Sequence, residues 1–412
     1  MTLTTDGKLL FATRIARLFA YGFLSIILVL YLAQVGLSGA EIGALLTLTL
    51  LGDAVISLWI TTSADHIGRR KMLLLGAGLM LFAGIAFALT GNIVLLAVAA
   101  IIGVISPGGG EIGPFLSIEQ AALAHIVPND QRTRVFAWYN LVGSFATATG
   151  ALVSGALAQF LQATGFAALD SYRVIVIGYA LFGILLALMF ARLSPRVEVE
   201  TFVGAFNKTP LPSFGLHRSR GIVLKLSALF ALDAFAGGFI VQSLIAYWFQ
   251  IRWGVEPALL GAIFFGGNIL AGISALSAAR IAARVGLINT MVWTHIPSNI
   301  LLMLVPLMPT LPFAILVLLV RYSISQMDVP TRQSYTMAVV APDERSAASG
   351  ITTIARSLGA AWSPALTGAL LSASLLTAPF FLAGGLKIIY DLTLWRSFRA
   401  LKPPEERMKA EG

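Results

Sequence analysis

The 412-residue sequence has no cysteine, only four histidines and few charged residues. Without cysteine, disulfide bonds and thiolate metal sites are excluded. Charged residues make up 11% of the chain and hydrophobic residues 58%, with a mean hydropathy of +0.86. A soluble globular domain carries about 25% charged residues. The shortage of charge therefore excludes a water-soluble protein and indicates an integral membrane protein.

Motifs for chemistry are also missing. The sequence contains no HExxH, no GxSxG and no clustered histidines, so neither metal nor nucleophile chemistry has visible residues. We expect no enzyme, no cofactor and no metal. The net charge of +9 follows from the basic loops of a membrane protein, and a nucleic-acid partner has no support.

Apolar stretches of about 20 residues, enough to cross a bilayer as a helix, recur along the chain. They predict an all-α integral membrane protein with twelve transmembrane helices in the lipid bilayer. The predicted spans are residues 13–34, 40–62, 72–90, 95–124, 134–160, 173–191, 222–250, 256–279, 288–308, 311–339, 346–371 and 375–395.

The basic residues predict the orientation. Of the 28 Lys and Arg, Arg173 and Arg252 fall in or at the edge of odd-numbered loops, and Arg321, Arg332, Arg356 and Lys387 fall deep inside spans. The other 22 lie in the termini and even-numbered loops or within five residues of them. By the positive-inside rule, both termini are cytoplasmic. We expect a multi-pass protein of the plasma membrane, the inner membrane of a prokaryote.

The two halves of the chain resemble each other. AYGFLSIILVLYLAQ at residues 20–34 matches AGGFIVQSLIAYWFQ 216 positions later, and EQAALAHIVPNDQR at 119–132 matches RQSYTMAVVAPDER 213 positions later. The repeat predicts two pseudo-symmetric six-helix bundles, at residues 1–191 and 222–412, joined by a cytoplasmic linker at 192–221.

The loop between spans two and three reads SADHIGRRKM. Its Asp, Gly and basic cluster resemble the signature of the major facilitator superfamily, although Thr61 stands where that signature has a glycine. The resemblance extends over the whole chain, is strongest to the twelve-helix proton antiporters of drugs and metabolites, and implies transport by rocking of two bundles. It gives the loop a gating role, whereas a plain positive-inside loop would explain only the basic residues. The motif residues are Asp65, Gly68, Arg69, Arg70 and Lys71.

Ionisable groups at membrane depth are costly and are therefore candidates for function. Asp53 lies 12 residues from both Glu41 and Asp65, near the predicted bilayer centre, and its repeat position holds Asn268. A carboxylate there could carry a proton, or it could hydrogen-bond to neighbouring hydroxyls for packing.

Span four is interrupted by SPGGGEIGP. Irregular backbone at membrane depth occurs only inside protein or beside water, so we expect the break to line the central cavity or a close helix contact. Glu111 could bind a cation, relay protons, pair with Arg321 or be a buried partner of another arginine. The break comprises Pro107, Gly108, Gly109 and Gly110.

The second half carries further charges at membrane depth. Asp328 and Arg332 are four residues apart and can pair with each other. Arg321 and Arg356 could bind an anionic substrate or hold Glu111 and Asp53.

Three further charges have predicted partners or roles. Arg17 and Asp233 occupy equivalent repeat positions and could form a salt bridge between the bundles. Lys387 is expected to pair with Asp391 four residues later, and His295 to be structural.

Because no GxxxxGK loop is present, transport must draw on an ion gradient, and intramembrane carboxylates favour protons. We predict a monomeric proton-coupled transporter of a small organic solute, with efflux by antiport as the first reading. A proton symporter that imports an organic anion is the alternative, and a non-transporting membrane sensor is the third. Free Arg321 and Arg356 would favour the anion.

Overall fold

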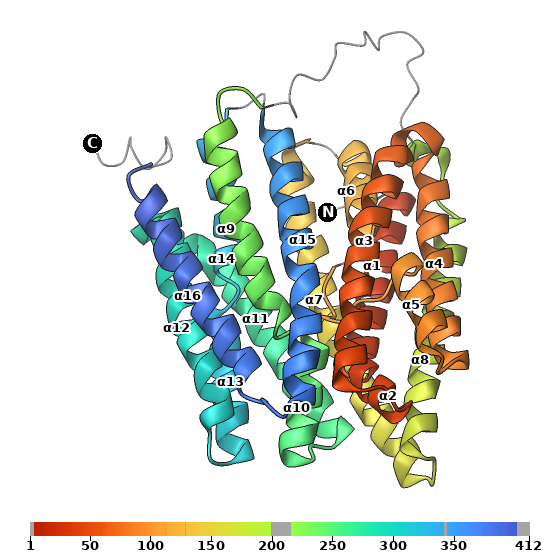
Figure 1. Cartoon of the computed structure of the whole chain (residues 1–412). Helices are drawn as coiled ribbons and strands as arrows, with labels where there is room; N and C mark the ends of the chain where they lie inside the picture. Colours follow the sequence, from red (N-terminus) through yellow and green to blue (C-terminus); the bar gives the residue numbers. More distant parts are fainter. Residues whose placement is uncertain (1–3, 112, 128, 199–215, 342–343, 402–412) are drawn as a thin grey trace. The chain divides into compact units, whose positions relative to one another are not determined.

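The computed structural model describes residues 4–111, 113–127, 129–198, 216–341 and 344–401 (Figure 1). These residues form helices and connecting loops, and no strand occurs among them. The side chain of Asp65 lies outside the described part. The chain divides into two compact units, each of which is described below by itself.

Unit 1 comprises Met1–Phe202, Val241–Ile269 and Leu371–Ala373. Within it α1 packs along α7, and α4 packs along α8. Its helices are α1 (Thr5–Ser25), α2 (Leu28–Gln34), α3 (Gly39–Ile67), α4 (Arg69–Leu89), α5 (Ile93–Ile102), α6 (Phe115–Ile126), α7 (Asn129–Ala163), α8 (Ala168–Phe190), η1 (Pro195–Val197), α10 (Gln242–Trp253) and the first part of α11 (Pro257–Val285).

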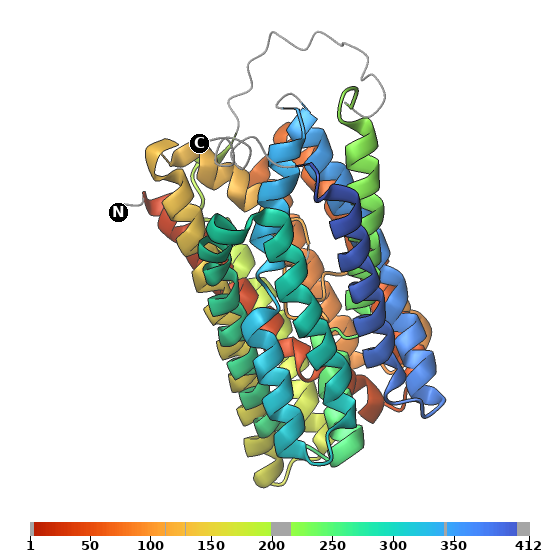
Figure 2. The same cartoon turned by 90° about the vertical axis from the view of Figure 1, so that its left-hand side faces the viewer.

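Unit 2 comprises Val203–Ile240, Leu270–Leu370 and Ser374–Gly412. Here α12 and α16 run side by side, as Figures 1 and 2 show, and α9 packs on α16. Its helices are α9 (Arg220–Gly238), the rest of α11, α12 (Leu287–Leu304), η3 (Val305–Leu307), α13 (Leu311–Ile324), α14 (Asp328–Val339), most of α15 (Arg345–Ser372) and α16 (Ala378–Phe398).

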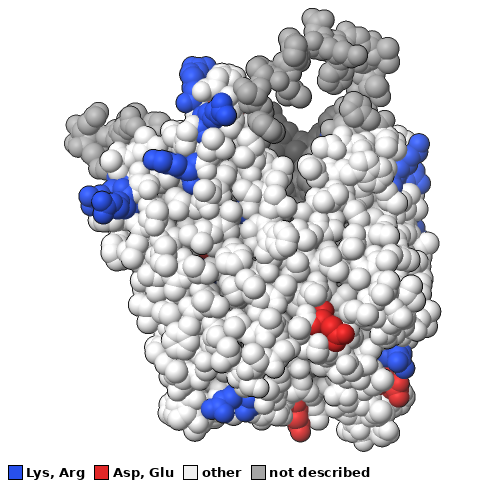
Figure 3. Space-filling model, in the orientation of Figure 1, with Lys and Arg blue, Asp and Glu red and all other residues white. Residues whose placement is uncertain are grey.

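Every predicted span falls on one helix or on a pair of consecutive helices. Spans one, four, seven and ten are pairs: α1 with α2, α5 with α6, α9 with α10 and α13 with α14. By length and apolarity, 8 described helices could cross a membrane, or 9 with the pair α1 and α2, which bends by 41°. The face in Figure 3 is largely uncharged, with most of its Lys and Arg near the top of the view and both Lys or Arg and Asp or Glu near the bottom.

Two features differ in detail from the sequence prediction. The helix α1 begins at Thr5 rather than at residue 13, so Arg17 lies about three turns inside it. The helix α10 and the first part of α11 group with unit 1, whereas the repeat divides the chain at 192–221. Residues 199–215 of that linker lie outside the described residues, and the division by repeat stays a prediction.

The repeat is visible in the closest helix contacts. A Cβ added to Gly22 of α1 would lie 2.0 Å from the carbonyl oxygen of Thr147 in α7. A Cβ added to Gly238 of α9 would lie 2.2 Å from Oγ of Ser363 in α15. Both members of the second pair stand 216 positions after those of the first. Equivalent helices therefore approach through equivalent glycines.

We expect Gly22→Ala and Gly238→Ala each to destabilise the protein by roughly 1–3 kcal/mol, because the added methyl meets backbone or a hydrogen-bonded hydroxyl. Thermal unfolding in detergent measures the loss. Gly78→Ala is the control, since nothing lies within 4 Å of its added Cβ. An unchanged melting temperature for Gly22→Ala would contradict the close contact.

Glu344, in the loop before α15, binds the backbone that leads into α9. Its Oε1 accepts from the N–H of His217 at 2.5 Å and of Arg218 at 2.7 Å, and Oε2 accepts from Ser219 N–H at 2.8 Å. Burial alone would raise the pKa of Glu344, but the hydrogen bonds from Ser219 and from these backbone groups lower it to about 2. The ionised carboxylate therefore stabilises the folded loop.

A folded-state pKa below the unfolded value of about 4.3 contributes stability that is complete above that value and is lost as the pH falls towards 2. Glu344→Gln should lower the melting temperature at pH 7, and its difference from the native chain should shrink as the pH falls below about 4.3. Asp170→Asn is the control, because Asp170 forms an exposed ion pair with Arg173. A difference that is independent of pH would refute this role.

Candidate functional site

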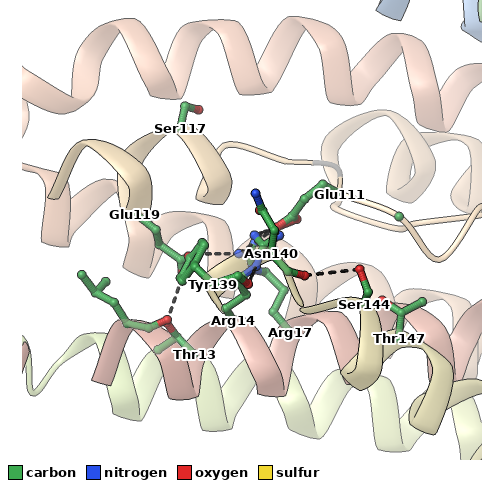
Figure 4. A network of polar contacts seen from close by, with 12 residues as sticks. Thr13, Arg14, Arg17, Glu111, Ser117, Glu119, Tyr139, Asn140, Ser144 and Thr147 are labelled. Carbon is green, nitrogen blue, oxygen red and sulfur yellow. Dashed lines mark hydrogen bonds and ion pairs between the residues drawn. The ribbon is translucent and has the colours of Figure 1, made fainter. Parts of the chain in front are cut away.

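Arg17 is the centre of a buried charge network in unit 1 (Figure 4). Its side chain has 0% exposure, and its guanidinium contacts Glu119 of α6 at 2.5 Å and Glu111 of the α5–α6 connection at 3.0 Å. Glu119 also accepts hydrogen bonds from Thr13 at 2.8 Å and from the hydroxyl of Tyr139. The buried cation is thus shared by two carboxylates.

Arg14 supplies the second cation of this network. Its Nη1 lies 2.6 Å from Glu111, its Nε donates to the carbonyl of Tyr139 at 2.7 Å, and Nη2 donates to Asn140 at 3.2 Å. Glu111 is 18% exposed, the largest exposure among the four charges. The predicted alternative in which Glu111 is a buried partner of an arginine fits this geometry, with Arg14 and Arg17 in place of Arg321.

The break in span four is held by other parts of unit 1. The carbonyl of Pro107 accepts from Ser243 N–H at 3.2 Å, and the carbonyl of Gly109 accepts from the Thr147 hydroxyl at 3.3 Å. Gly109 has φ +68, and an added Cβ would lie 3.0 Å from Ser25 Oγ, so glycine is required there. Protein donors therefore satisfy the carbonyls of Pro107 and Gly109, and the break makes a close contact at Gly109. Beside Gly108 and Gly110 an added Cβ would meet nothing within 4 Å.

Asn268 belongs to a neutral chain of hydrogen bonds next to the break. Its Nδ2 donates to Gln242 Oε1 at 3.2 Å, and Gln242 Nε2 donates to Ser25 Oγ at 2.8 Å. These hydrogen bonds join the end of α1, the start of α10 and the glycine-rich part of α11. They fix the start of α10 without using any charge.

Asp53 stands at the middle of α3 and is half-buried. Its Oδ1 accepts from the hydroxyl of Ser57 at 3.0 Å. No ion pair joins Asp53 to a Lys, Arg or His among the residues that the structure describes. Its carboxylate therefore differs from those of Glu111 and Glu119, which have arginine partners.

Asp233 of α9 is the centre of the network in unit 2. Three helices supply cations to its carboxylate: Arg332 of α14 at 3.1 Å, Arg356 of α15 at 3.1 Å and Lys387 of α16 at 2.6 Å. The predicted pair of Asp328 with Arg332 is present at 3.0 Å. Arg17 and Asp233 each have charge partners within their own unit, and a bridge between the bundles stays a prediction.

The predicted pair of Lys387 with Asp391 is wrong. Lys387 reaches Asp233 instead, while Asp391 accepts from Asn299 at 3.2 Å and contacts His295 Nδ1 at 2.9 Å. Spacing along α16 permits the pair, but partners on α9 and α12 lie closer. His295 is buried against Asp391, and its structural role stays a prediction.

Arg321 is buried at the end of α13, with 9% exposure. Its guanidinium lies 5.3 Å from the ring centre of Tyr322, and its Nε has no hydrogen-bond partner in the described part of the chain. No described carboxylate forms an ion pair with it. Arg321 is thus a cation at membrane depth that stacks on an aromatic ring.

The signature loop is a tight turn. Gly68 has φ 115 between α3 and α4, and Glu198 Oε2 and Oε1 accept from the N–H of Arg69 at 2.6 Å and of Arg70 at 3.1 Å. Arg70 also donates to the carbonyl of Ala191 at the end of α8. The basic residues therefore tie helix ends together within unit 1. Lys71 is exposed, and the side chain of Asp65 lies outside the described part of the chain. The gating role of the loop therefore stays a prediction.

Arg14, Glu119, Tyr139 and Asn140 are site residues that the sequence prediction did not select. One signal was available: Glu119 stands at the repeat position of Arg332, and Asn140 at that of Arg356. Equivalent positions thus hold polar groups in both units.

Helical spans in two repeated sets, with ion pairs buried at membrane depth, are the features of a membrane transporter. The family model of the Major Facilitator Superfamily matches residues 9–364. The chain belongs to this family, whose fold supports secondary transport by alternating access.

Known relatives agree with this membership. The chain is 30% identical to the uncharacterized membrane protein YJR124C of Saccharomyces cerevisiae, over 94% of this chain and 93% of the relative. The crystal structure of a D-xylose-proton symporter has a TM-score of 0.73 and 15% identity, covering 94% and 97% of the two chains. A bacterial homologue of the human lysosomal transporter Spinster has a TM-score of 0.67 and 16% identity, covering 95% of each chain.

We expect Arg17→Met and Glu119→Leu each to cost roughly 3–5 kcal/mol of stability, since each leaves a buried charge without its partner. The double variant should lose less than the sum, because Arg14 and Glu111 remain as a balanced pair. Thermal unfolding of the three variants in detergent tests this coupling. Strictly additive losses would show that the two residues act independently.

Proposed function

We propose that the chain is a proton-coupled secondary transporter of a small organic solute and that Asp53 carries the proton. The observation that carries this proposal is the isolation of Asp53. The carboxylates of Glu111, Glu119, Asp233, Asp328 and Asp391 have an arginine, lysine or histidine partner, whereas Asp53 accepts from the hydroxyl of Ser57 and forms no ion pair among the described residues. Asp6, in the first turn of α1, is bound by Ser194 instead. Taking up a proton removes a charge that no cation of the described residues balances by an ion pair.

The position of Asp53 also suits this role. It lies 14 residues from either end of α3, or about 21 Å along the helix. A group at that depth can exchange protons with either side only when water reaches it, and alternating access supplies water from one side at a time. The hydroxyl of Ser57 and the backbone N–H of Gly113 orient the carboxylate without neutralising it.

Efflux by antiport is favoured by the glycines of α7. Gly150 packs against Phe19, where an added Cβ would lie 2.1 Å from the carbonyl oxygen, and Gly155 packs equally closely against Pro257. Spaced glycines in this span resemble those of exporters, in which they seal one end of the pathway, although α7 lacks their proline.

Import of an organic anion by symport is favoured by the surplus of cations in unit 2. Arg321 has no carboxylate partner among the described residues, and Arg356 shares Asp233 with two other cations. The two directions require the same proton carrier. In either case we propose a monomer in the plasma membrane with both termini cytoplasmic.

The test is proton movement in everted membrane vesicles with a pH-sensitive dye, against lipophilic cations, sugars and organic anions. We expect at least one solute to move protons with the native chain and none to do so with Asp53→Asn. Ser57→Ala, which keeps the carboxylate, should retain coupling, and so should Glu111→Gln if that residue is only an arginine partner. Solute flux that a protonophore leaves unchanged would reject proton coupling and leave facilitated diffusion.

The same vesicles separate the two directions. A solute exchanged for protons raises the pH of an acidic lumen, whereas a symported solute that enters lowers the pH of a neutral lumen. Asp53→Asn should abolish whichever signal the native chain gives.

A further inference from the structure

The carboxylate of Asp233 receives more positive charge than it can neutralise. Arg356 and Arg332 both contact Oδ2, and Lys387 contacts Oδ1. Arg332 is shared with Asp328, which leaves two carboxylates for three cations. Each of these five residues lies on a helix of unit 2, at a depth where unbalanced charge is costly.

The neighbouring groups do not remove this surplus. Asp391 is bound to His295 and Asn299 on α12 rather than to the cations. Arg321 adds a further cation, without a carboxylate partner in the described part of the chain. Deep within the predicted membrane spans of unit 2, the cations Arg321, Arg332, Arg356 and Lys387 therefore stand against the carboxylates Asp233, Asp328 and Asp391 when His295 is neutral.

Arg356 is the accessible member of the cluster. Its side chain is 34% exposed, whereas those of Asp233, Arg332 and Lys387 are 4–10% exposed. The hydrogen bond to Asp233 uses Nη1 alone. A guanidinium has five N–H donors in a fixed fork, so donors remain for a second acceptor.

The exposed part of Arg356 must face water or protein. It lies 11 residues into α15, and charged groups at such depth face the bundle interior or a water-filled cavity instead of lipid. Ser349 and Thr353, seven and three residues earlier, fall on the same side of the helix. This polar face leads from the start of α15 to the cluster.

We propose that Arg356 binds the anionic group of the transported solute and that Asp233 holds the guanidinium in place for it. The solute is then a small organic anion, with a carboxylate or a similar oxyanion that matches the guanidinium fork. The surplus charge of the cluster is the charge that the anion neutralises. This assignment rests on the proposed function and names its substrate class.

The test is ligand-dependent thermal stability of the purified full chain in detergent, with lactate, succinate, benzoate and inorganic phosphate as probes. We expect at least one of these anions to stabilise the native chain. Its affinity should fall about 10- to 100-fold in Arg356→Gln, which removes a charge-assisted hydrogen bond. Arg356→Lys keeps the charge without the fork and should lose less.

Arg396→Gln is the matched control, because it removes an equal charge at an exposed position near the end of α16. Size-exclusion profiles test whether each variant is folded. If Arg356→Gln does not fold, Arg356→Lys is used for the affinity measurement instead. The assignment is overturned if none of the four anions stabilises the native chain. It is also overturned if the folded Arg356 variants bind them as tightly as Arg396→Gln does.

Anion binding and proton-driven flux, measured separately, distinguish failure of this assignment from failure of the proposed function. Anion binding that depends on Arg356, together with transport indifferent to the pH gradient, keeps the binding site and rejects proton coupling. A pH-driven flux of a neutral or cationic solute that no anion inhibits keeps proton coupling and rejects the anion site.

Discussion

The cost of placing charge in a membrane interior governs the arrangement of this protein. An unpaired charge costs several kcal/mol there, so a buried arginine or carboxylate is stabilised by a partner on a neighbouring helix. Arg17 meets this need through Glu111 and Glu119, and Asp233 meets it through three cations. These contacts tie α1 to α6 and the α5–α6 connection in unit 1, and α9 to α14, α15 and α16 in unit 2. Helix packing and charge pairing thus depend on each other.

The two networks use equivalent positions with opposite charges. Arg17 corresponds to Asp233, and Glu119 corresponds to Arg332. Both pairs are in contact within their units, at 2.5 Å for Arg17 with Glu119 and 3.1 Å for Arg332 with Asp233. A buried ion pair keeps its attraction when both signs are reversed, so the repeat can keep the contact while it exchanges the residues. What the halves share is the helix geometry, set by contacts such as Gly22 with Thr147 and Gly238 with Ser363.

The sequence predicted the helices well because hydrophobicity and length determine where a helix can cross a membrane. It also located the break at Pro107, since proline and glycines disfavour a helix. The sequence did not predict which charged side chains on different helices pair with each other. The expected pair of Lys387 with Asp391 used spacing along one helix, which sequence reveals, whereas the actual partners lie on α9 and α12. Contacts between helices depend on rotation and depth, and a single sequence carries only the repeat as a guide to them.

The departures from symmetry are where function is expected. Unit 1 has the lone carboxylate Asp53, whose repeat position holds neutral Asn268, and unit 2 has Arg356, whose repeat position holds neutral Asn140. Among the described charges within the predicted spans, unit 1 therefore carries an unbalanced negative charge and unit 2 an unbalanced positive charge. A proton on Asp53 and an anion at Arg356 would each cancel the imbalance of its own unit. Loading both ligands then leaves an interior with less uncompensated charge than the empty protein, which lowers the electrostatic cost of the change between access states. Loading one ligand leaves the other charge uncompensated, and this difference is a physical basis for the symport alternative, in which proton and anion cross together.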